Sequence, residues 1–176
     1  MKKAFLLDRD GTINVDSGYV GAVKDVKLLP GAGEAIRRIN QAGYLAIVVS
    51  NQSGVARGYF DINAVDQVNR RLNELLAEYN AHIDVFYYCP HLKNAEVAEF
   101  AVDCDCRKPR LGMFRRAIEE YELNPAKCYA CGDKLRDVEN LTQLGLPAAH
   151  LGVLQENEKY SSYDSLLSFV NSSLLP

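Results

Sequence analysis

Short apolar runs alternate along this chain with longer segments whose apolar residues recur at helical spacing. The runs that we expect to be strands are residues 4–7, 44–49, 84–88, 127–130 and 148–153. The segments that we expect to be helices are residues 32–41, 62–80, 112–121, 138–144 and 162–170. Bounded apolar runs of this length are typical of strands buried on both faces of a parallel sheet. The alternation therefore predicts an α/β fold with a parallel, doubly wound sheet and right-handed crossovers.

Residues that start or stop helices set several of these boundaries. Pro30-Gly31 marks a turn before helix 32–41, and Gly43 ends that helix. Asp61 is a suitable N-cap for the longest helix. The apolar residues of the longest helix fall on one stripe, which we interpret as core and not as a binding surface. They are Ile62, Val65, Val68, Leu72, Leu75, Leu76 and Tyr79.

Two segments have neither a helical nor an alternating period. Residues 13–27 are mixed and are punctuated by Gly18 and Gly21, and we interpret them as a small flap over the end of the first strand. A plain surface loop is the alternative. Residues 89–111 form a much longer irregular stretch. Loops of this length are uncommon in small domains, so this stretch is expected to need a local constraint.

The bulk properties describe an ordinary globular protein. Its 176 residues are enough for a substantial core in one domain, residues 1–176. The net charge is −3 and no run of Lys or Arg forms a basic patch, so we expect no nucleic-acid partner. No stretch could span a bilayer, and Asp8 ends the first apolar run too early for a signal peptide, so we expect a cytoplasmic protein with no membrane contact. In that compartment the five cysteines are expected to be metal ligands or buried thiols.

Two aspartates directly follow the first expected strand. Asp8 and Asp10 are two residues apart, which places them on one side of an extended backbone, and Gly11-Thr12 follows them. Ligands of open α/β sheets bind at the carboxyl ends of the strands, so both carboxylates are expected to line a crevice. Two carboxylates this close repel each other unless a cation lies between them or one is protonated. A solvated turn is the alternative for such a pair taken alone.

Three further strand ends carry residues suited to phosphate chemistry. Ser50 can donate a hydrogen bond to a phosphate oxygen, as can the backbone N–H groups that follow it. Lys108 can neutralise a phosphoryl group, and the neighbouring Arg107 can bind a second anion through two parallel hydrogen bonds. Asp133 and Asp137 add carboxylate oxygens, which Mg²⁺ prefers. Each has an ordinary alternative, namely a capping serine, a solvated basic pair and an acidic helix start.

Together these four strand ends resemble motifs I to IV of the haloacid dehalogenase (HAD) superfamily of phosphohydrolases. In chain order the matching residues are Asp8 and Asp10, Ser50, Lys108, and Asp133 and Asp137. The resemblance covers nearly the whole chain. It implies a HAD-like Rossmannoid three-layer sandwich with a parallel sheet and no inserted cap. It also implies a catalytic Mg²⁺ held by Asp8, Asp10 and Asp133, with Asp137 orienting the metal shell.

A second set of residues has the composition of a zinc site. Cys89, His91, Cys104 and Cys106 all lie in the irregular segment 89–111. Three thiolates and an imidazole form a tetrahedral set in which protein fills all four positions, so we interpret this Zn²⁺ as structural. The metal would then be the constraint that the long loop needs. Buried free thiols are the alternative.

Other reactive side chains receive no functional role. Cys128 and Cys131 have the spacing of a C-x-x-C motif, but they lie at an expected strand and we interpret them as core cysteines. His82 and His150 have no nearby partner pattern, and we assign them no role.

The Cys-x-His and Cys-x-Cys-Arg-Lys-Pro motifs narrow the resemblance to a branch of heptose bisphosphate and histidinol-phosphate phosphatases. The longer zinc loop and the sequence from Ser50 to Phe60 resemble the heptose enzymes. This implies a monomer whose substrate is a small sugar bisphosphate, D-glycero-D-manno-heptose 1,7-bisphosphate, in ADP- or GDP-heptose synthesis of the lipopolysaccharide type. The residues that the resemblance implies for substrate binding are Asp16, Ser17, Gly18, Tyr19, Asn51, Gln52, Ser53, Arg107 and Lys134.

The resemblance also implies a mechanism. Asp8 would attack phosphorus to form an aspartyl-phosphate, and Asp10 would act as the general acid and then as the base. Ser50 and Lys108 would stabilise the transition state, and Arg107 would bind the phosphate that is not hydrolysed. A phosphatase for histidinol phosphate or another small phosphomonoester is one alternative. A zinc-stapled binding module is another, although such a module needs no nucleophile; the absence of a P-loop motif argues against the commonest nucleotide-dependent phosphotransferases.

Overall fold

The computed structural model describes residues 1–153 and 160–175, and in these residues a single parallel sheet organises the fold. The strands are β1 (Ala4–Leu7), β2 (Leu45–Asn51), β3 (Val85–Cys89), β4 (Tyr129–Gly132), β5 (Ala148–Leu151) and β6 (Ser161–Tyr163). Their order across the sheet is β3-β2-β1-β4-β5-β6, and every neighbouring pair is parallel. This order reverses direction at β1, so the prediction of a doubly wound parallel sheet is confirmed.

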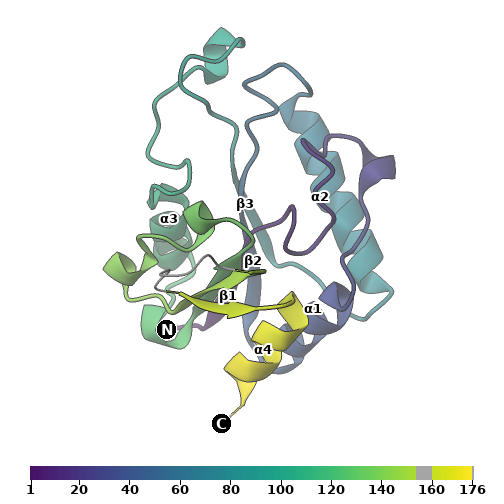
Figure 1. Cartoon of the computed structure of the whole chain (residues 1–176), viewed down its shortest axis with the longest axis vertical. Coiled ribbons are helices and arrows are strands. Elements are labelled where there is room, and N and C mark those ends of the chain that lie inside the picture. The colour runs from purple at the N-terminus through teal and green to yellow at the C-terminus, as the bar shows by residue number, and fades with distance from the viewer. Residues whose placement is uncertain (154–159, 176) are drawn as a thin grey trace.

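Helices cover both faces of the sheet (Figure 1). The α-helices are α1 (Ala32–Gln41), α2 (Ile62–Ala77), α3 (Gly112–Glu120) and α4 (Leu166–Leu174). Short 3₁₀ helices are η1 (Val23–Asp25), η2 (Ala98–Phe100), η3 (Pro125–Lys127), η4 (Leu135–Asp137) and η5 (Leu141–Leu144). Phe5 and Leu7 pack in a core with α1, α2 and α4, whereas Ala4 and Leu6 pack with α3 and η5. Successive residues of β1 therefore pack into cores on opposite faces of the sheet. The two helical layers and the sheet between them form the predicted three-layer sandwich.

Two segments leave the compact layers. Residues 13–27 form no regular element beyond η1, as expected for a flap, and Asn14 bridges to both Asp10 and Leu28. The segment from Cys89 to Leu111 contains only η2 and projects beyond β3, at the top of the view in Figure 1. No further α/β unit is inserted within residues 1–153 and 160–175, in agreement with the cap-less prediction.

Several predicted boundaries are wrong. β4 begins at Tyr129 rather than Lys127, because Asn124 caps the turn η3 that contains Lys127. Consequently Gly132, predicted to lie in a turn, is the last residue of the strand. Residues 138–144 do not form one α-helix; the chain forms η4 and η5 there, and Gly145 ends η5 at a positive φ of 68°.

The C-terminal part differs more. Residues 162–170 were expected to be one helix, but the edge strand β6 occupies Ser161–Tyr163, and α4 begins only after Ser165. Ser165 caps α4 by accepting a hydrogen bond from the Ser168 amide, at 3.2 Å. The edge strand has a polar sequence and therefore lacks the apolar run that identified the other strands.

The stripe on α2 is core over most of its length. Asp61 accepts a hydrogen bond from the Ala64 amide at 2.8 Å, which confirms the N-cap. Val65, Val68, Leu72 and Leu76 are fully buried. Ile62 and Tyr79, at the two ends, are 38% and 46% exposed, so their assignment to the core is wrong. Ile62 is the first residue of α2, and Tyr79 lies after its end at Ala77, so the prediction that the helix extends to residue 80 is also wrong.

The remaining cysteines are buried, as predicted. Cys128 is fully buried with α3, whereas Cys131 is 2% exposed and packs on the opposite face of the sheet. The two thiols thus lie in different cores and do not form a redox pair. Among the described residues, no helix combines the length and the apolar character needed to cross a membrane.

Candidate active site

The carboxyl ends of the central strands hold a buried ion-paired centre. The Asp8 amide still donates to the Cys131 carbonyl at 2.9 Å, so the sheet fixes the position of Asp8. The Lys108 Nζ lies 2.7 Å from Asp8 Oδ1 and 2.7 Å from Asp137 Oδ1. It also donates to the Val49 carbonyl at 2.5 Å. The lysine side chain is 1% exposed, so one cation is shared by two carboxylates almost without water.

Burial dominates the protonation of this centre. It raises the pKa of Asp8 to about 7, against the opposing effect of the Lys108 ammonium and with a further contribution from the Asp137 carboxylate. Burial would lower the pKa of Lys108, but Asp8 and Asp137 outweigh it and the net shift is upward. The lysine therefore stays charged. An additional cation beside Asp8 would favour its ionised, nucleophilic form.

Asp10 is held by a residue that the sequence interpretation overlooked. Arg9 donates to both Asp10 carboxylate oxygens, at 3.1 and 3.0 Å, and to Asn69 Oδ1 at 2.9 Å. Its side chain is 1% exposed. Asn14 and Gln52 also donate to Asp10, at 2.8 and 2.9 Å. Burial would raise the pKa of Asp10, but the Arg9 charge and these hydrogen bonds outweigh it and lower the pKa.

The polar residues after β2 mainly organise other protein groups. Asn51 Nδ2 donates to the Lys108 carbonyl and Asn51 Oδ1 accepts from the Lys108 amide, both at 3.0 Å. Gln52 Nε2 donates to Ser50 Oγ at 2.7 Å as well as to Asp10. Asn51 therefore positions the lysine segment, and Gln52 links Ser50 to Asp10. The sequence motif identified these residues but not these partners.

The carboxylates at this edge suit a divalent cation. Oxygen atoms of Asp8, Asp133 and Asp137 lie within 4.8 Å of one another. Asp133 Oδ1 is buried without a hydrogen-bond partner among the described residues. Gly11 allows this approach, because it has a φ of +83° and a Cβ atom there would lie 2.4 Å from Asp133 Oδ2. The carboxylate of Asp10 points into its own network instead, so any Asp10 ligand atom would be its backbone carbonyl.

A polar pocket of about 300 Å³ opens above this centre. It is lined by Asp8, Asp10, Asp16, Gly18, Tyr19, Ser50, Asn51, Gln52, Ser53, Gly54, Arg57, Arg107 and Arg136. Most of the residues predicted to bind substrate are thus brought together. Ser17 is exposed outside the lining, and Lys134 pairs with Asp133 Oδ2 at 2.7 Å instead. A larger hollow of about 720 Å³ lies beside β3 and α3, but its lining contains none of Asp8, Asp10, Asp133 and Asp137.

Two arginines in this lining were missed at the sequence level. Arg57 lies in the turn after β2, and Arg136 lies in η4, directly before Asp137. Both arginines stand close to residues that the sequence analysis identified: Arg57 follows the motif that begins at Ser50, and Arg136 precedes Asp137. A basic residue close to a recognised motif is therefore the signal that could have found them.

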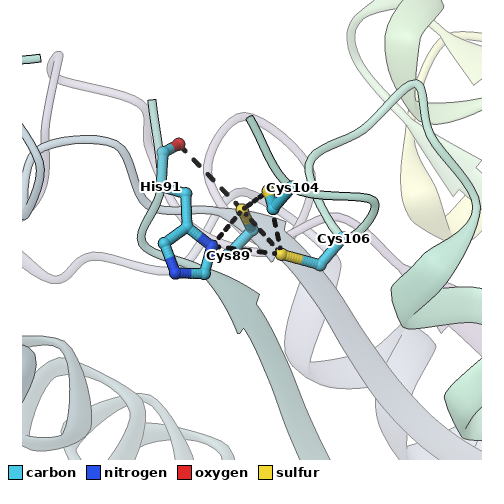
Figure 2. Close-up of side chains that lie close together, drawn as sticks. All are labelled: Cys89, His91, Cys104 and Cys106. Atoms are coloured by element: carbon cyan, nitrogen blue, oxygen red, sulfur yellow. Dashed lines mark hydrogen bonds between the residues drawn. The ribbon is translucent and has the colours of Figure 1, made fainter. Parts of the chain in front are cut away.

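The predicted zinc ligands converge in a compact set (Figure 2). Cys106 Sγ lies 3.1 Å from Cys89 Sγ and 3.2 Å from Cys104 Sγ, and the Cys89 and Cys104 sulfurs are 3.5 Å apart. His91 presents Nδ1 to this group, 3.4 Å from Cys106 Sγ and 3.8 Å from Cys89 Sγ. None of the three cysteines forms a disulfide.

These separations fit a tetrahedral metal site. Ligand bonds of about 2.3 Å to sulfur and about 2.0 Å to nitrogen would place the ligand atoms roughly 3.5–3.8 Å apart. The sulfur–sulfur distances of 3.1, 3.2 and 3.5 Å are shorter than this, and the nitrogen–sulfur distances of 3.4 and 3.8 Å lie close to it. Burial raises the pKa of Cys89 and Cys106 above the usual value, whereas hydrogen bonds outweigh burial and lower the pKa of Cys104. A cation would therefore favour the thiolate form of Cys89 and Cys106. The donor set and its geometry therefore suit Zn²⁺.

The Cys/His set also positions the basic residues of the site. Cys106 is followed directly by Arg107 and Lys108, so the sulfur cluster fixes one end of this tripeptide. Arg107 Nη1 donates to the His91 carbonyl at 3.3 Å, which fixes the guanidinium against the same loop. Since Asn51 holds the Lys108 backbone from the sheet side, the lysine is anchored from both directions.

The chain is similar to known proteins over most of its length. The family model described as Polynucleotide kinase 3 phosphatase matches residues 4–162. D-glycero-beta-D-manno-heptose-1,7-bisphosphate 7-phosphatase of Haemophilus ducreyi is 44% identical over 138 residues, covering 78% of this chain and 75% of that one. The enzyme of the same name from Escherichia coli strain K12 is 40% identical over 136 residues, covering 77% and 71%.

Solved structures agree with these relatives. A HAD-like phosphatase from Mesorhizobium loti has a TM-score of 0.87 at 34% identity and covers 98% of this chain and 85% of that one. D,D-heptose 1,7-bisphosphate phosphatase from B. bronchiseptica, complexed with magnesium and phosphate, has a TM-score of 0.85 at 31% identity, with 99% and 98% covered.

The sheet, the paired carboxylates at its edge and these likenesses define a HAD-like phosphatase, an enzyme that hydrolyses phosphate monoesters. Within that class, the chain belongs to the family of the D-glycero-beta-D-manno-heptose-1,7-bisphosphate 7-phosphatases.

Replacing Arg9 with Met should destabilise the fold by roughly 3 kcal/mol, because the buried Asp10 carboxylate would lose its paired cation. Urea unfolding monitored by circular dichroism measures this change. Arg37→Met is the matched control, since Arg37 pairs with Glu34 at the surface and should change stability little. Equal effects of the two substitutions would contradict the role assigned to Arg9.

Proposed function

We propose that this enzyme removes the 7-phosphate of D-glycero-beta-D-manno-heptose 1,7-bisphosphate to give heptose 1-phosphate. The observation that carries the proposal is the pocket, which has the Asp8–Lys108 centre at its base and arginines in its wall. A small, doubly phosphorylated sugar matches that distribution of charge. The names of the relatives support both the substrate and the beta anomer. The product would be used in the synthesis of ADP- or GDP-heptose precursors. We also propose that the active protein is a monomer with a single domain.

The reaction would proceed in two steps through Asp8. In the first, an Asp8 oxygen forms a bond to phosphorus as the bond to the sugar oxygen breaks, giving an aspartyl-phosphate and a sugar alcohol. Asp10 supplies the proton to the departing sugar oxygen, a role for which its carboxyl must be protonated in the substrate complex, against the effect of Arg9 in the free protein. In the second, Asp10 takes a proton from the water that attacks phosphorus, which releases phosphate and restores Asp8. Dividing the reaction in this way replaces one difficult step with two easier ones.

Lys108 and Ser50 would stabilise the transferred phosphoryl group. The Lys108 ammonium lies 2.7 Å from Asp8 Oδ1, so it is beside the position where charge develops. Ser50 is 2% exposed and its oxygen accepts a hydrogen bond from Gln52, which leaves its own proton free for a phosphate oxygen. Both groups are fixed before substrate arrives, so they need little reorganisation during the reaction.

We assign Mg²⁺ to the carboxylate edge. Asp8, Asp133 and the Asp10 carbonyl would hold it, and Asp137 would orient the shell through its pairing with Lys108. A bound Mg²⁺ neutralises phosphate charge, which lets an anionic nucleophile approach phosphorus. The buried, unpartnered Asp133 Oδ1 supports this assignment, as does the magnesium in the B. bronchiseptica structure.

We assign a structural Zn²⁺ to Cys89, His91, Cys104 and Cys106. All four ligand positions come from the protein, which leaves no open position for catalysis. The metal would hold the long loop in place and, through it, Arg107 and Lys108.

Purified enzyme with Mg²⁺ should release phosphate most efficiently from the beta anomer of heptose 1,7-bisphosphate. The alpha anomer, histidinol phosphate and an oligonucleotide with a 3′-phosphate serve as comparison substrates, with kcat/KM measured for each. The oligonucleotide is included because the matching family model is described as Polynucleotide kinase 3 phosphatase. Preference for histidinol phosphate or for the oligonucleotide would overturn the proposed substrate.

Asp8→Asn should abolish phosphate release, because the amide cannot form the acyl-phosphate. Phosphate release and the circular dichroism spectrum are measured on the same preparation, so that misfolding is recognised. Asp66→Asn, which removes an exposed carboxylate on α2, is the matched control and should retain activity. Turnover by a folded Asp8→Asn enzyme would exclude the aspartyl-phosphate route.

Replacing Cys104 and Cys106 with Ser should remove the zinc and lower stability by several kcal/mol, because the energy of binding a structural metal is also folding energy. Metal content by mass spectrometry and thermal unfolding are the measurements. Cys128→Ala alters a buried cysteine outside the metal set and should keep the zinc. If the double variant retains one zinc per chain, the ligand assignment is wrong.

A further inference from the structure

Three arginines from distant segments line the same pocket. Arg57 follows β2, Arg107 belongs to the long loop, and Arg136 belongs to η4. None of them forms an ion pair with a carboxylate within residues 1–153 and 160–175, unlike Arg9, Arg37 or Arg110. Three positive charges without counter-charges in a pocket of about 300 Å³ create a strong local preference for an anion.

Arg57 is oriented before any ligand binds. Its guanidinium lies over the ring of Tyr19, 5.6 Å from the ring centroid, and Tyr19 in turn packs edge to face against Tyr59 at 4.9 Å. Its Nε atom is buried and has no hydrogen-bond partner among the described residues. Buried donors without partners are rare and costly, so this guanidinium retains a donor that a bound acceptor would satisfy.

Arg107 lines the pocket together with the other two arginines. Its Nη1 atom donates to the His91 carbonyl at 3.3 Å, so the long loop fixes its guanidinium. A dianionic group bound in this pocket could accept paired hydrogen bonds from more than one arginine.

The same pocket contains the residues of the buried centre. Asp8, Asp10 and Asp16 also line it, and the Lys108 ammonium lies 2.7 Å from Asp8 Oδ1. A phosphate beside Asp8 is exposed to the proposed nucleophile, and Lys108 and Ser50 would stabilise it. A substrate with only that phosphate would leave the three arginines without an anionic partner, whereas a bisphosphate would supply one.

We propose that Arg57 and Arg136 are specificity-determining residues that complete, with Arg107, a subsite for the phosphate that is not hydrolysed. The proposal rests on the proposed function, because it takes the substrate to be a sugar bisphosphate. Arg57 is fixed by the flap residue Tyr19, and Arg136 is carried by the same short turn as Asp137. The subsite is therefore built from the flap, the long loop and the acidic turn together.

Arg136→Gln tests this directly, since Arg136 is exposed and has no hydrogen bond to lose among the described residues. We expect KM for heptose 1,7-bisphosphate to rise about tenfold or more, because a hydrogen-bonded charge pair is lost. For heptose 7-phosphate, which lacks the second phosphate, kcat and KM should stay unchanged. Arg57→Gln should raise the same KM in the same way. Arg57→Lys, which keeps the positive charge, should raise it less.

Arg70→Gln removes an exposed arginine of α2 outside the pocket and controls for the change in net charge. If Arg136→Gln lowers kcat/KM equally for the bisphosphate and the monophosphate, or lowers it for neither, the proposed subsite is wrong.

A separate measurement distinguishes this failure from failure of the proposed function. Calorimetric binding of heptose 1,7-bisphosphate and of inorganic phosphate is compared in the Asp8→Asn background with and without Arg136→Gln. If the wild-type enzyme prefers another substrate, the proposed function fails. Weakened binding of the bisphosphate alone in the double variant would still support the subsite, and unchanged binding would refute it.

Discussion

Four carboxylates must lie close together at one edge of the sheet, and the rest of the structure supplies the cations that make this possible. Lys108 is shared by Asp8 and Asp137 at 2.7 Å from each. The remaining pairs are Arg9 with Asp10 and Lys134 with Asp133. Removing Lys108 or Arg9, whose side chains are buried, would leave a negative charge with little water around it, which is far costlier than losing a surface pair. The charge balance of this edge therefore constrains the sheet, the flap and the long loop at once.

The most consequential cation comes from the least regular part of the chain. Lys108 has no helix or strand to position it, since the segment from Pro90 to Leu111 contains only one 3₁₀ turn. Its position depends on the sulfur cluster two residues away and on two hydrogen bonds with Asn51, one in each direction. A loop alone would sample many positions, and holding it costs conformational entropy. The Cys/His set and Asn51 offset that cost where the charge balance requires it.

The sequence predicted what depends on local pattern. β1 and α1 have the predicted bounds, because a buried strand and a capped amphipathic helix follow from neighbouring residues alone. β6 was missed because a polar edge strand has no such pattern. Arg9 was missed for another reason: in sequence it separates two aspartates, and only the contact with Asn69, sixty residues away, shows that it is buried. The motif residues converged as expected, but the partners of Asn51 and Gln52 depend on tertiary packing that local sequence does not encode.

Two pairs of adjacent residues connect the buried centre with the pocket wall. Lys108 reaches Asp8 while its neighbour Arg107 lines the pocket, and Asp137 reaches Lys108 while its neighbour Arg136 lines the same wall. Each arginine of these two pairs therefore stands one peptide bond from a charge of the buried centre. Contacts with a remote part of the substrate accelerate a reaction when they help to orient the reacting groups. This adjacency explains why a phosphatase with so small a pocket would favour a substrate that carries charge at both ends.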